Sequence, residues 1–330
     1  MVYAFMPAQV LGVAARLRLA DQLAGGRMSL AELAAATQTH EPSLRRLLRA
    51  LACLEVVTEP EPGVFELAPA GRHLRADVPD SIRAAALLFT SEEMWRSWAQ
   101  LEYTVRTGNI AWDHAIGMSV FEFMDRHPEQ SGTFNAAMAD RTRTVSPRIA
   151  AAYDFGRFER LVDLGGGDGT LMAAILSSAP NLRGVLFDQP AGVAHAAENL
   201  RAAGVADRCE IVSGDFFVAV PQGADAYLLK SVIHNWSDDG AVTILSNCRK
   251  AIRDDGTLIL IERVLPERIS SPAVSRAIFS DINMLVNTHG MERTEAEFRA
   301  LYSAAGFELT ETVATGEEPV GYQVLVGHPV

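Results

Sequence analysis

Cysteine is rare and positive charge is in deficit in this sequence of 330 residues. The three cysteines, Cys53, Cys209 and Cys248, include no C-x-x-C pair. They are odd in number and far apart in the sequence, so neither a disulfide framework nor a structural zinc site is expected. Lysine and arginine total 29 against 41 aspartates and glutamates, which gives a net charge of −12. Such a chain repels phosphate polyanions, so we expect no nucleic-acid partner and no binding to anionic membranes.

Long apolar runs are also absent. No run reaches the about 20 residues that a membrane-spanning helix needs, and the N-terminal segment is interrupted by Arg16 and Arg18. That segment has no basic lead-in of the kind that precedes an export signal. We therefore expect a cytoplasmic protein. Hydrophobic residues make up 48% of the 330 positions, which is sufficient for a large core divided between two domains.

Residues 1–150 have the pattern of a mainly helical domain. In SLAELAAAT, Ser29 and Glu32 form a capping box, and Pro42 marks the start of the helix PSLRRLLRALACLE. The turn-rich VVTEPEPGVFELAP then predicts a hairpin. Successive helices and a hairpin are typical of a winged helix. Further helices are expected at 8–23, 81–107, 119–126 and 129–153.

A winged helix raises the alternative of a DNA-binding transcriptional regulator. Up to Leu74 the chain has seven arginines and seven acidic residues. A module without net positive charge has little attraction for phosphate groups. The charge balance therefore favours a role in dimerisation over DNA binding.

Residues 151–330 alternate short apolar runs with helical segments. The runs are RLVDL, RGVLFD, CEIVSG, AYLLK and GTLILIE. Buried runs of this kind are typical of parallel strands covered on both faces, which predicts an α/β fold with a doubly wound sheet. The C-terminal segment contains two strand-like runs with no helix between them, so we expect an antiparallel edge.

The segment LVDLGGGDGT forms the first strand-to-helix turn of this half. Glycine at Gly165 and Gly167 allows positive φ angles and close approach of a ligand to the backbone. The dinucleotide pattern G-x-G-x-x-G fails, because its third position falls on Thr170. Asp163 at the strand end suits a ligand with positive charge better than it suits a pyrophosphate.

Two further strand ends carry acidic residues. Asp188 in FDQP can accept both hydroxyl groups of a ribose, and Asp215 in GDFF can accept the amine of adenine while Phe216 packs against its ring. Each aspartate alone is as well explained by a helix cap. Three at successive strand ends, without a phosphate-binding loop, predict a site for an adenosine that has no phosphates.

The motifs DLGGGDG, DQP, GDFF and HNW at these spacings resemble those of S-adenosylmethionine-dependent O-methyltransferases of the plant caffeate type and their bacterial relatives in antibiotic pathways. The resemblance covers nearly the whole chain. It implies a Rossmann-like class I methyltransferase sheet with an antiparallel last strand and an N-terminal winged-helix dimerisation domain. It implies S-adenosyl-L-methionine as cofactor, bound by Gly165, Gly167, Asp188, Asp215, Phe216, Lys230 and Trp236, and its position at a strand end adds Asp163 to this set.

The resemblance also implies a catalytic group, His234 with Glu262 and Glu292. A phenol has a pKa of about 10 and a histidine about 6.5, so a largely neutral imidazole can accept the phenol proton at pH 7. A carboxylate on the far ring nitrogen fixes the tautomer. A lone histidine is more often a core residue, but Trp236 and the two glutamates favour a base. No metal is expected, because the acidic cluster of magnesium-dependent methyltransferases is not found.

Acceptor contacts are implied for Met138, Met284 and Asn287, the methionines clamping an aromatic ring. The chain departs from the family at Asn235, where most members have aspartate, and at His289, where many have glycine. Both changes make the cleft less acidic.

We therefore predict a homodimeric O-methyltransferase that methylates a phenolic hydroxyl of a small aromatic secondary metabolite. The alternative within the family is a diverted reaction, such as hydroxylation, decarboxylation or a ring-forming rearrangement, with the cofactor as a scaffold. Methylation of an amine or a carboxylate also stays open.

Overall fold

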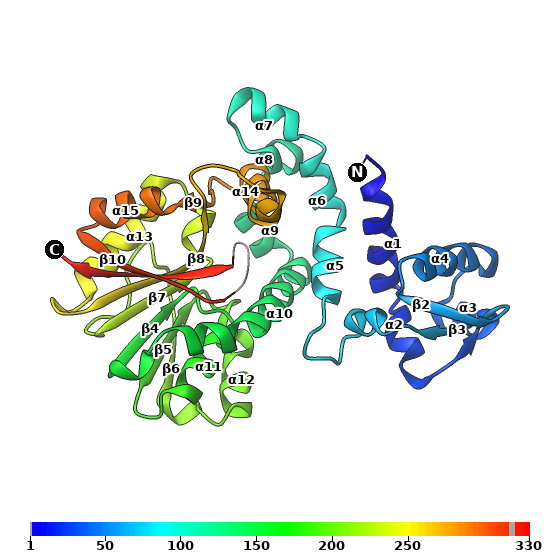
Figure 1. The fold of residues 1–330 in the computed structure, drawn as a ribbon, viewed down its shortest axis with the longest axis horizontal. Coiled ribbons are helices and arrows are strands. Elements are labelled where there is room, and N and C mark those ends of the chain that lie inside the picture. Colours follow the sequence, from blue (N-terminus) through cyan, green and yellow to red (C-terminus); the bar gives the residue numbers. More distant parts are fainter. Residues whose placement is uncertain (1, 317–320) are drawn as a thin grey trace. The chain divides into compact units, whose positions relative to one another are not determined.

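The chain forms two compact units in a computed structural model that describes residues 2–316 and 321–330 (Figure 1). One unit comprises Met1–Arg96 and Met124–Arg141, and the other comprises Ser97–Phe123 and Thr142–Val330. Segments 97–123 and 142–150, expected in the helical domain, thus group with the sheet. The reason is packing: α7 and α8 contact α14, and Ile149 on α10 lies in a core beneath the sheet.

The first unit contains the predicted winged helix. Ser29 Oγ accepts the N–H of Glu32, and Glu32 Oε2 accepts the N–H of Ser29, so the capping box is confirmed. Pro42 lies in the first turn of α4, also as predicted. The hairpin strands join β1 in an antiparallel sheet of order β1-β3-β2. The elements within this unit are η1 Val2–Ala4, α1 Phe5–Arg16, α2 Leu19–Gln22, η2 Leu23–Gly25, β1 Met28–Ser29, α3 Leu30–Thr37, α4 Glu41–Cys53, β2 Val57–Glu61, β3 Val64–Leu67, η3 Ala70–Leu74 and α5 Arg83–Phe89.

The long helix expected at 81–107 is divided into α5, α6 and α7. The first break lies at Thr90 and Ser91. Thr90 Oγ1 donates to the carbonyl of Ala86, and Ser91 Oγ accepts the N–H of Met94. These hydroxyl groups compete for backbone partners, end α5 and start α6. Three helices extend across the division between the units: α6 Glu92–Trp98, α9 Val120–Arg126 and α10 Pro128–Ala152.

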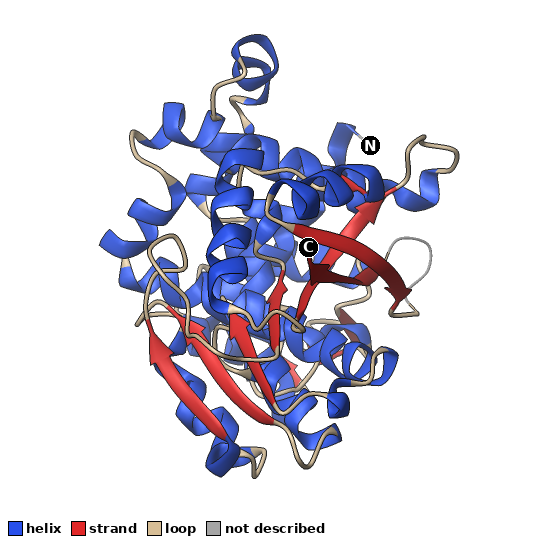
Figure 2. Cartoon of the chain, turned by 90° about the vertical axis from the view of Figure 1, so that its left-hand side faces the viewer, coloured by secondary structure: helices blue, strands red, loops and turns tan. Residues whose placement is uncertain are grey.

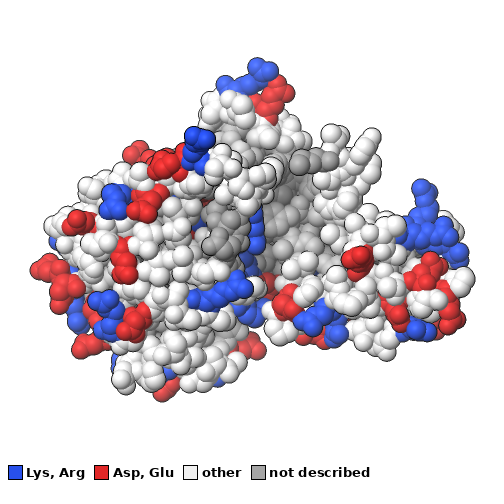
Figure 3. Space-filling view, in the orientation of Figure 1, with Lys and Arg blue, Asp and Glu red and all other residues white. Residues whose placement is uncertain are grey.

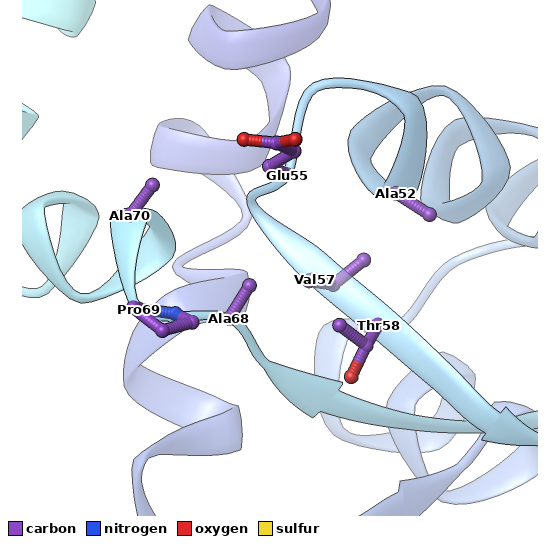
Figure 4. Close-up of a pocket in the computed structure, with 7 residues that line it drawn as sticks. All are labelled: Ala52, Glu55, Val57, Thr58, Ala68, Pro69 and Ala70. Carbon is purple, nitrogen blue, oxygen red and sulfur yellow. The ribbon is translucent and has the colours of Figure 1, made fainter.

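The surface of the winged-helix unit carries both signs of charge. Basic and acidic side chains lie side by side on the face in Figure 3, and Arg27 forms ion pairs with Glu61 and Glu66. A cavity of about 400 Å³ beside the hairpin has only Glu55 and Thr58 as polar side chains (Figure 4). Neither feature offers a group for catalysis.

The second unit is built on a sheet of order β10-β11-β8-β7-β4-β5-β6. Strand β11 runs antiparallel to both of its neighbours, and the strands from β8 to β6 are parallel, which confirms the predicted fold class. The strands are β4 Arg160–Leu164, β5 Arg183–Asp188, β6 Cys209–Ser213, β7 Ala226–Lys230, β8 Thr257–Leu265, β9 Arg293–Thr294, β10 Phe307–Ala314 and β11 Tyr322–Pro329. The short β9 pairs with the end of β8.

Helices cover both faces of this sheet (Figure 2). One core contains residues of α13 and α15, and the other contains residues of α10, α11 and α12. Within the described residues, no helix is both long and apolar enough to span a bilayer. The helices and 3₁₀ turns are α7 Leu101–Thr107, α8 Ala111–Ile116, η4 Phe155–Arg157, α11 Thr170–Ser178, η5 Val193–His195, α12 Ala196–Ala202, η6 Ala206–Arg208, η7 Ile233–Asn235, α13 Asp238–Ala251, η8 Pro272–Val274, α14 Ser275–Asn287 and α15 Glu295–Ala304.

Candidate active site

The glycine loop follows β4, the strand between β7 and β5 where the chain order of the sheet reverses. Ligands bind at such a position in open α/β sheets. Gly165 and Gly167 have φ angles of 70° and 59°. A Cβ on Gly165 would lie 2.7 Å from Val232 Cγ2, whereas a Cβ on Gly167 would meet no atom within 4 Å. The left-handed backbone favours glycine at both positions, and at Gly165 the contact with Val232 excludes a side chain as well.

Asp163 lies beneath this loop at the end of β4 and is 1% exposed. Its Oδ2 has no hydrogen-bond partner in the part of the chain that the structure describes. Burial raises the pKa of Asp163 to about 7, although the charge of Lys230 acts to lower it. A buried carboxyl with an unused oxygen fits a ligand that brings an ammonium group, such as the methionine part of the cofactor.

Asp188 ends β5 and faces the glycine loop. Its Oδ2 accepts the N–H of Gly167 at 2.8 Å, and its Oδ1 accepts the N–H of Gln189 at 2.7 Å. Each oxygen keeps a second acceptor position, so the carboxylate can still accept the two hydroxyl groups of a ribose. Burial raises the pKa of Asp188, and the two N–H groups oppose this rise.

Asp215 and Phe216 follow β6, the next strand along the same edge. Asp215 is exposed, and its Oδ1 accepts the N–H of Phe217 at 2.8 Å. Asn247 on α13 donates to the carbonyls of Phe216 and Phe217 at 2.9 and 3.0 Å. This asparagine was not predicted from the sequence, since it belongs to none of the motifs.

Trp236 and Lys230 complete the predicted cofactor residues. The ring of Trp236 stacks on Phe121 at 5.0 Å and meets the edge of Phe216 at 6.2 Å. Lys230 at the end of β7 donates to Thr142 Oγ1 at 2.8 Å. The structure thus brings all eight predicted residues to the carboxyl ends of β4 to β7, while the contact that each makes with the cofactor stays a prediction.

His234 lies on η7, directly after β7, and is 8% exposed. Its Nδ1 is 3.4 Å from Glu262 Oε2 and 3.3 Å from Glu292 Oε1. Both glutamates are buried. With Nδ1 directed at two acids, Nε2 is the nitrogen that can accept a proton. The structure therefore brings together the three catalytic residues predicted from the sequence.

Glu262 also holds the backbone of the histidine loop. Its Oε1 accepts the N–H groups of Val232, Ile233 and His234 at 3.0, 2.9 and 3.4 Å. Burial raises the pKa of Glu262, against the charge of His234 and these N–H groups. One oxygen thus fixes the loop and the other faces the imidazole.

The expectation of a largely neutral imidazole at pH 7 is wrong for the protein without ligands. Burial acts to lower the pKa of His234, but the charge of Glu262 and the hydrogen bond and charge of Glu292 outweigh it, and the pKa rises to about 9. The imidazolium is therefore the resting form. A ligand with positive charge at this edge would oppose that form.

Two residues outside the predicted set, Arg293 on β9 and Gly290 just before it, pack against the histidine loop. Arg293 is buried and donates to the carbonyl of Ile233 at 3.2 Å and to Asp238 Oδ1 at 2.8 Å. A Cβ on Gly290 would lie 1.9 Å from the carbonyl oxygen of His234. This contact leaves no room for a side chain at position 290, so glycine is required there, whereas position 289 can carry histidine.

The predicted acceptor residues lie on two helices. Met138 is half-buried on α10, in the first unit, and Met284 is half-buried on α14, in the second. Asn287 is buried, accepts from Ser97 Oγ at 2.9 Å and donates to the carbonyl of Asn283 at 2.9 Å. Asn287 thus ties α6 to α14, and its contact with an acceptor stays a prediction.

His234, Glu262 and Glu292 also offer ligand atoms within 4.8 Å of one another, as a cation site would. One oxygen of each carboxylate is already used. Glu262 Oε1 accepts backbone N–H groups, and Glu292 Oε1 accepts Ser280 Oγ at 2.7 Å. Glu262 Oε2 and Glu292 Oε1 lie 3.4 and 3.3 Å from His234 Nδ1, within the range of ion pairs, so we interpret both carboxylates as partners of the imidazole.

Comparison with known proteins identifies the family. The O-methyltransferase domain matches residues 98–308, and the O-methyltransferase dimerisation domain matches residues 1–77. The phenazine O-methyltransferase PhzM of Lysobacter antibioticus is 40% identical over 330 residues, which cover 100% of this chain and 95% of that protein.

Solved structures agree with this assignment. The crystal structure of LaPhzM has a TM-score of 0.95 and 40% identity and covers 100% of this chain and 97% of its own. The neocarzinostatin O-methyltransferase NcsB1, solved with S-adenosylmethionine and 2-hydroxy-5-methyl naphthoic acid, has a TM-score of 0.82 and 30% identity and covers 98% and 96%. The predicted family and cofactor are confirmed. The chain belongs to the S-adenosylmethionine-dependent O-methyltransferases that act on aromatic secondary metabolites.

Proposed function

We propose that the enzyme methylates a phenolic hydroxyl group, with His234 as the general base. The observation that supports this most strongly is the placement of His234 Nδ1 between two buried carboxylates. This geometry leaves Nε2 to receive a proton, on the loop that follows β7 beside the glycine loop.

Different residues of the chain bind the cofactor and accept the proton. When bound, S-adenosylmethionine supplies a methyl group on a positively charged sulfur atom. Asp163 receives the ammonium group and Asp188 the ribose. In its neutral form, after loss of the proton that it carries at rest, His234 takes the phenol proton at Nε2, and Glu262 and Glu292 stabilise the resulting imidazolium. A positioned base of this kind contributes about 10²- to 10⁴-fold in rate.

A flat aromatic acceptor fits the relatives and the chain. PhzM is named for a phenazine, and NcsB1 was solved with a naphthoic acid. Thioethers such as that of Met284 make favourable contacts with aromatic rings. We therefore place a fused or substituted aromatic ring with a hydroxyl group beside α14. The dimerisation-domain match at residues 1–77 supports a homodimer.

The test is methyl transfer to 1,4-dihydroxy-2-naphthoic acid and related phenols, with methylated product and S-adenosylhomocysteine both measured by mass spectrometry. His234→Gln should lower kcat by about a hundredfold or more and change the affinity for S-adenosylhomocysteine less than about twofold, because only the proton acceptor is lost. His40→Gln, at an exposed histidine, is the control. Conversion of the acceptor without formation of S-adenosylhomocysteine would show that the enzyme catalyses a reaction other than methyl transfer. Full turnover by His234→Gln would remove the base from the mechanism.

A further inference from the structure

Ser280 lies on α14 and was not among the predicted site residues. Its Oγ donates to Glu292 Oε1 at 2.7 Å, and this same oxygen lies 3.3 Å from His234 Nδ1. The next residue, Asp281, accepts the N–H of Glu292 at 3.0 Å. Helix α14 therefore holds Glu292 by its carboxylate and by its backbone.

We propose that Ser280 is a positioning residue for the general base, which fixes the Glu292 carboxylate at His234 Nδ1 and weakens its hold on the imidazole proton. The proposal rests on the proposed role of His234. It extends the catalytic group from three side chains to four.

The physical reason is competition for one oxygen. A hydroxyl group bonded to a carboxylate makes a short, charge-assisted hydrogen bond, and the 2.7 Å distance has this character. The bond stabilises the anion and satisfies part of its capacity to accept hydrogen bonds. Without it, the imidazolium is a stronger partner for Glu292 Oε1. The proton is then held more tightly on His234, and the neutral base is less abundant at pH 7.

Other charged and titratable groups surround the pair on every neighbouring element. Glu262 on β8 and Tyr322 on β11 act on His234, and both raise its pKa. Burial raises the pKa of Asp281 on α14, which also feels Glu292 itself, Glu297 on α15 and Arg293 on β9. A substitution at Ser280 leaves all of these residues in place. A change in the pKa of His234 can therefore be assigned to loss of the Ser280 hydroxyl group.

The decisive experiment is an NMR titration of the His234 imidazole in the full-length protein without ligands, its resonance assigned by its loss in His234→Gln. Ser280→Ala should raise the pKa of His234 by about one unit, the effect of one hydrogen bond to a charged group. Ser280→Thr, which keeps the hydroxyl group, should restore the parent value. Ser275→Ala, on the exposed first turn of α14, is the matched control and should titrate like the parent.

The pH dependence of kcat, measured with 1,4-dihydroxy-2-naphthoic acid as the acceptor, is a second test. The rising limb of kcat against pH should move to higher pH in Ser280→Ala, so that kcat falls about tenfold near pH 7 and recovers at high pH. An unchanged or lowered His234 pKa in Ser280→Ala, a loss of equal size at every pH, or failure of threonine to restore the titration would overturn the proposal. The NMR titration needs no acceptor, so a failure of the proposed phenol chemistry would be seen separately.

Discussion

At the scale of single residues, the site is defined by ionisable groups that are buried before any ligand binds. The pKa of Asp163 is raised to about 7 by burial, and the pKa of His234 is raised to about 9 because its two acids outweigh burial. At pH 7 and without ligands, His234 is therefore mainly protonated and Asp163 is about half protonated. Because a ligand with positive charge favours loss of these protons, cofactor binding and proton release are coupled.

The charge of His234 should make the choice between S-adenosylmethionine and S-adenosylhomocysteine depend on pH. Both ligands carry the amino-acid group that we propose Asp163 binds, so the titration of Asp163 should affect both affinities equally and leave their ratio unchanged. They differ by the positive charge on sulfur, which the imidazolium repels. The preference for S-adenosylmethionine should therefore rise with pH through about 9, as His234 loses its proton.

Isothermal calorimetry with both ligands at a series of pH values measures this preference. The ratio should be nearly independent of pH in His234→Gln, which removes the titrating group. A ratio that stays constant in the parent, or one that changes equally in the variant, would show that His234 lies too far from the sulfur to sense its charge.

At the scale of elements, strand β8 holds the loop that follows its neighbour β7. Glu262 on β8 accepts the N–H groups of Val232 and Ile233 in the loop that presents His234. The parallel register pairs Lys230 with Ile261, which places the loop directly beside Glu262. The position of His234, the proposed base, is therefore set by a neighbouring strand and not by the loop alone.

Two substitutions at Glu262 should separate its two roles. Glu262→Gln keeps a carbonyl oxygen for the loop N–H groups but loses the charge, so turnover should fall more than stability. Glu262→Ala leaves those buried N–H groups without their acceptor, and the free energy of unfolding should fall by about 3 kcal/mol or more. Urea denaturation measures this loss, and Glu198→Ala, at an exposed position on α12, should change it by less than about 0.5 kcal/mol. Equal stability of the two Glu262 variants would contradict the role of Glu262 Oε1 in holding the loop.

At the scale of the whole molecule, the N-terminal segment exposes apolar side chains, although the ring of Phe5 also meets Trp95 edge-on at 6.4 Å. Val2, Tyr3 and Phe5 are 86%, 72% and 49% exposed, in the segment that matches the dimerisation domain. Exposed apolar groups close together in sequence are typical of a surface that another protein covers. We expect that partner to be a second copy of the chain.

Charge placed on this surface should disrupt the homodimer. The double variant Tyr3→Glu and Phe5→Glu should sediment as a monomer at micromolar concentration, because two carboxylates would be buried in the interface. Val330→Glu, at an exposed apolar residue at the other end of the chain, should leave the sedimentation coefficient unchanged. A parent protein that sediments as a monomer, or a double variant that stays dimeric, would contradict this arrangement.

Local signals in the sequence determined much of this protein. The strands RLVDL, RGVLFD and AYLLK coincide with β4, β5 and β7, because apolar runs bounded by turn residues depend on few distant contacts. The capping box at Ser29 and the glycine loop are local for the same reason. The placement of Asp163 and Asp188 at one edge follows from the parallel order of the strands, which the alternation of strand and helix predicted.

Only the tertiary structure decided how the catalytic group works. His234, Glu262 and Glu292 come from separate segments, and the hydrogen bonds from Ser280 and to Asp238 involve residues that no motif marks. The pKa of His234 moves to about 9 because Coulomb interactions depend on distances of a few ångströms and on burial. The sequence determined which residues carry charge, and packing determined how strongly those charges act on each other.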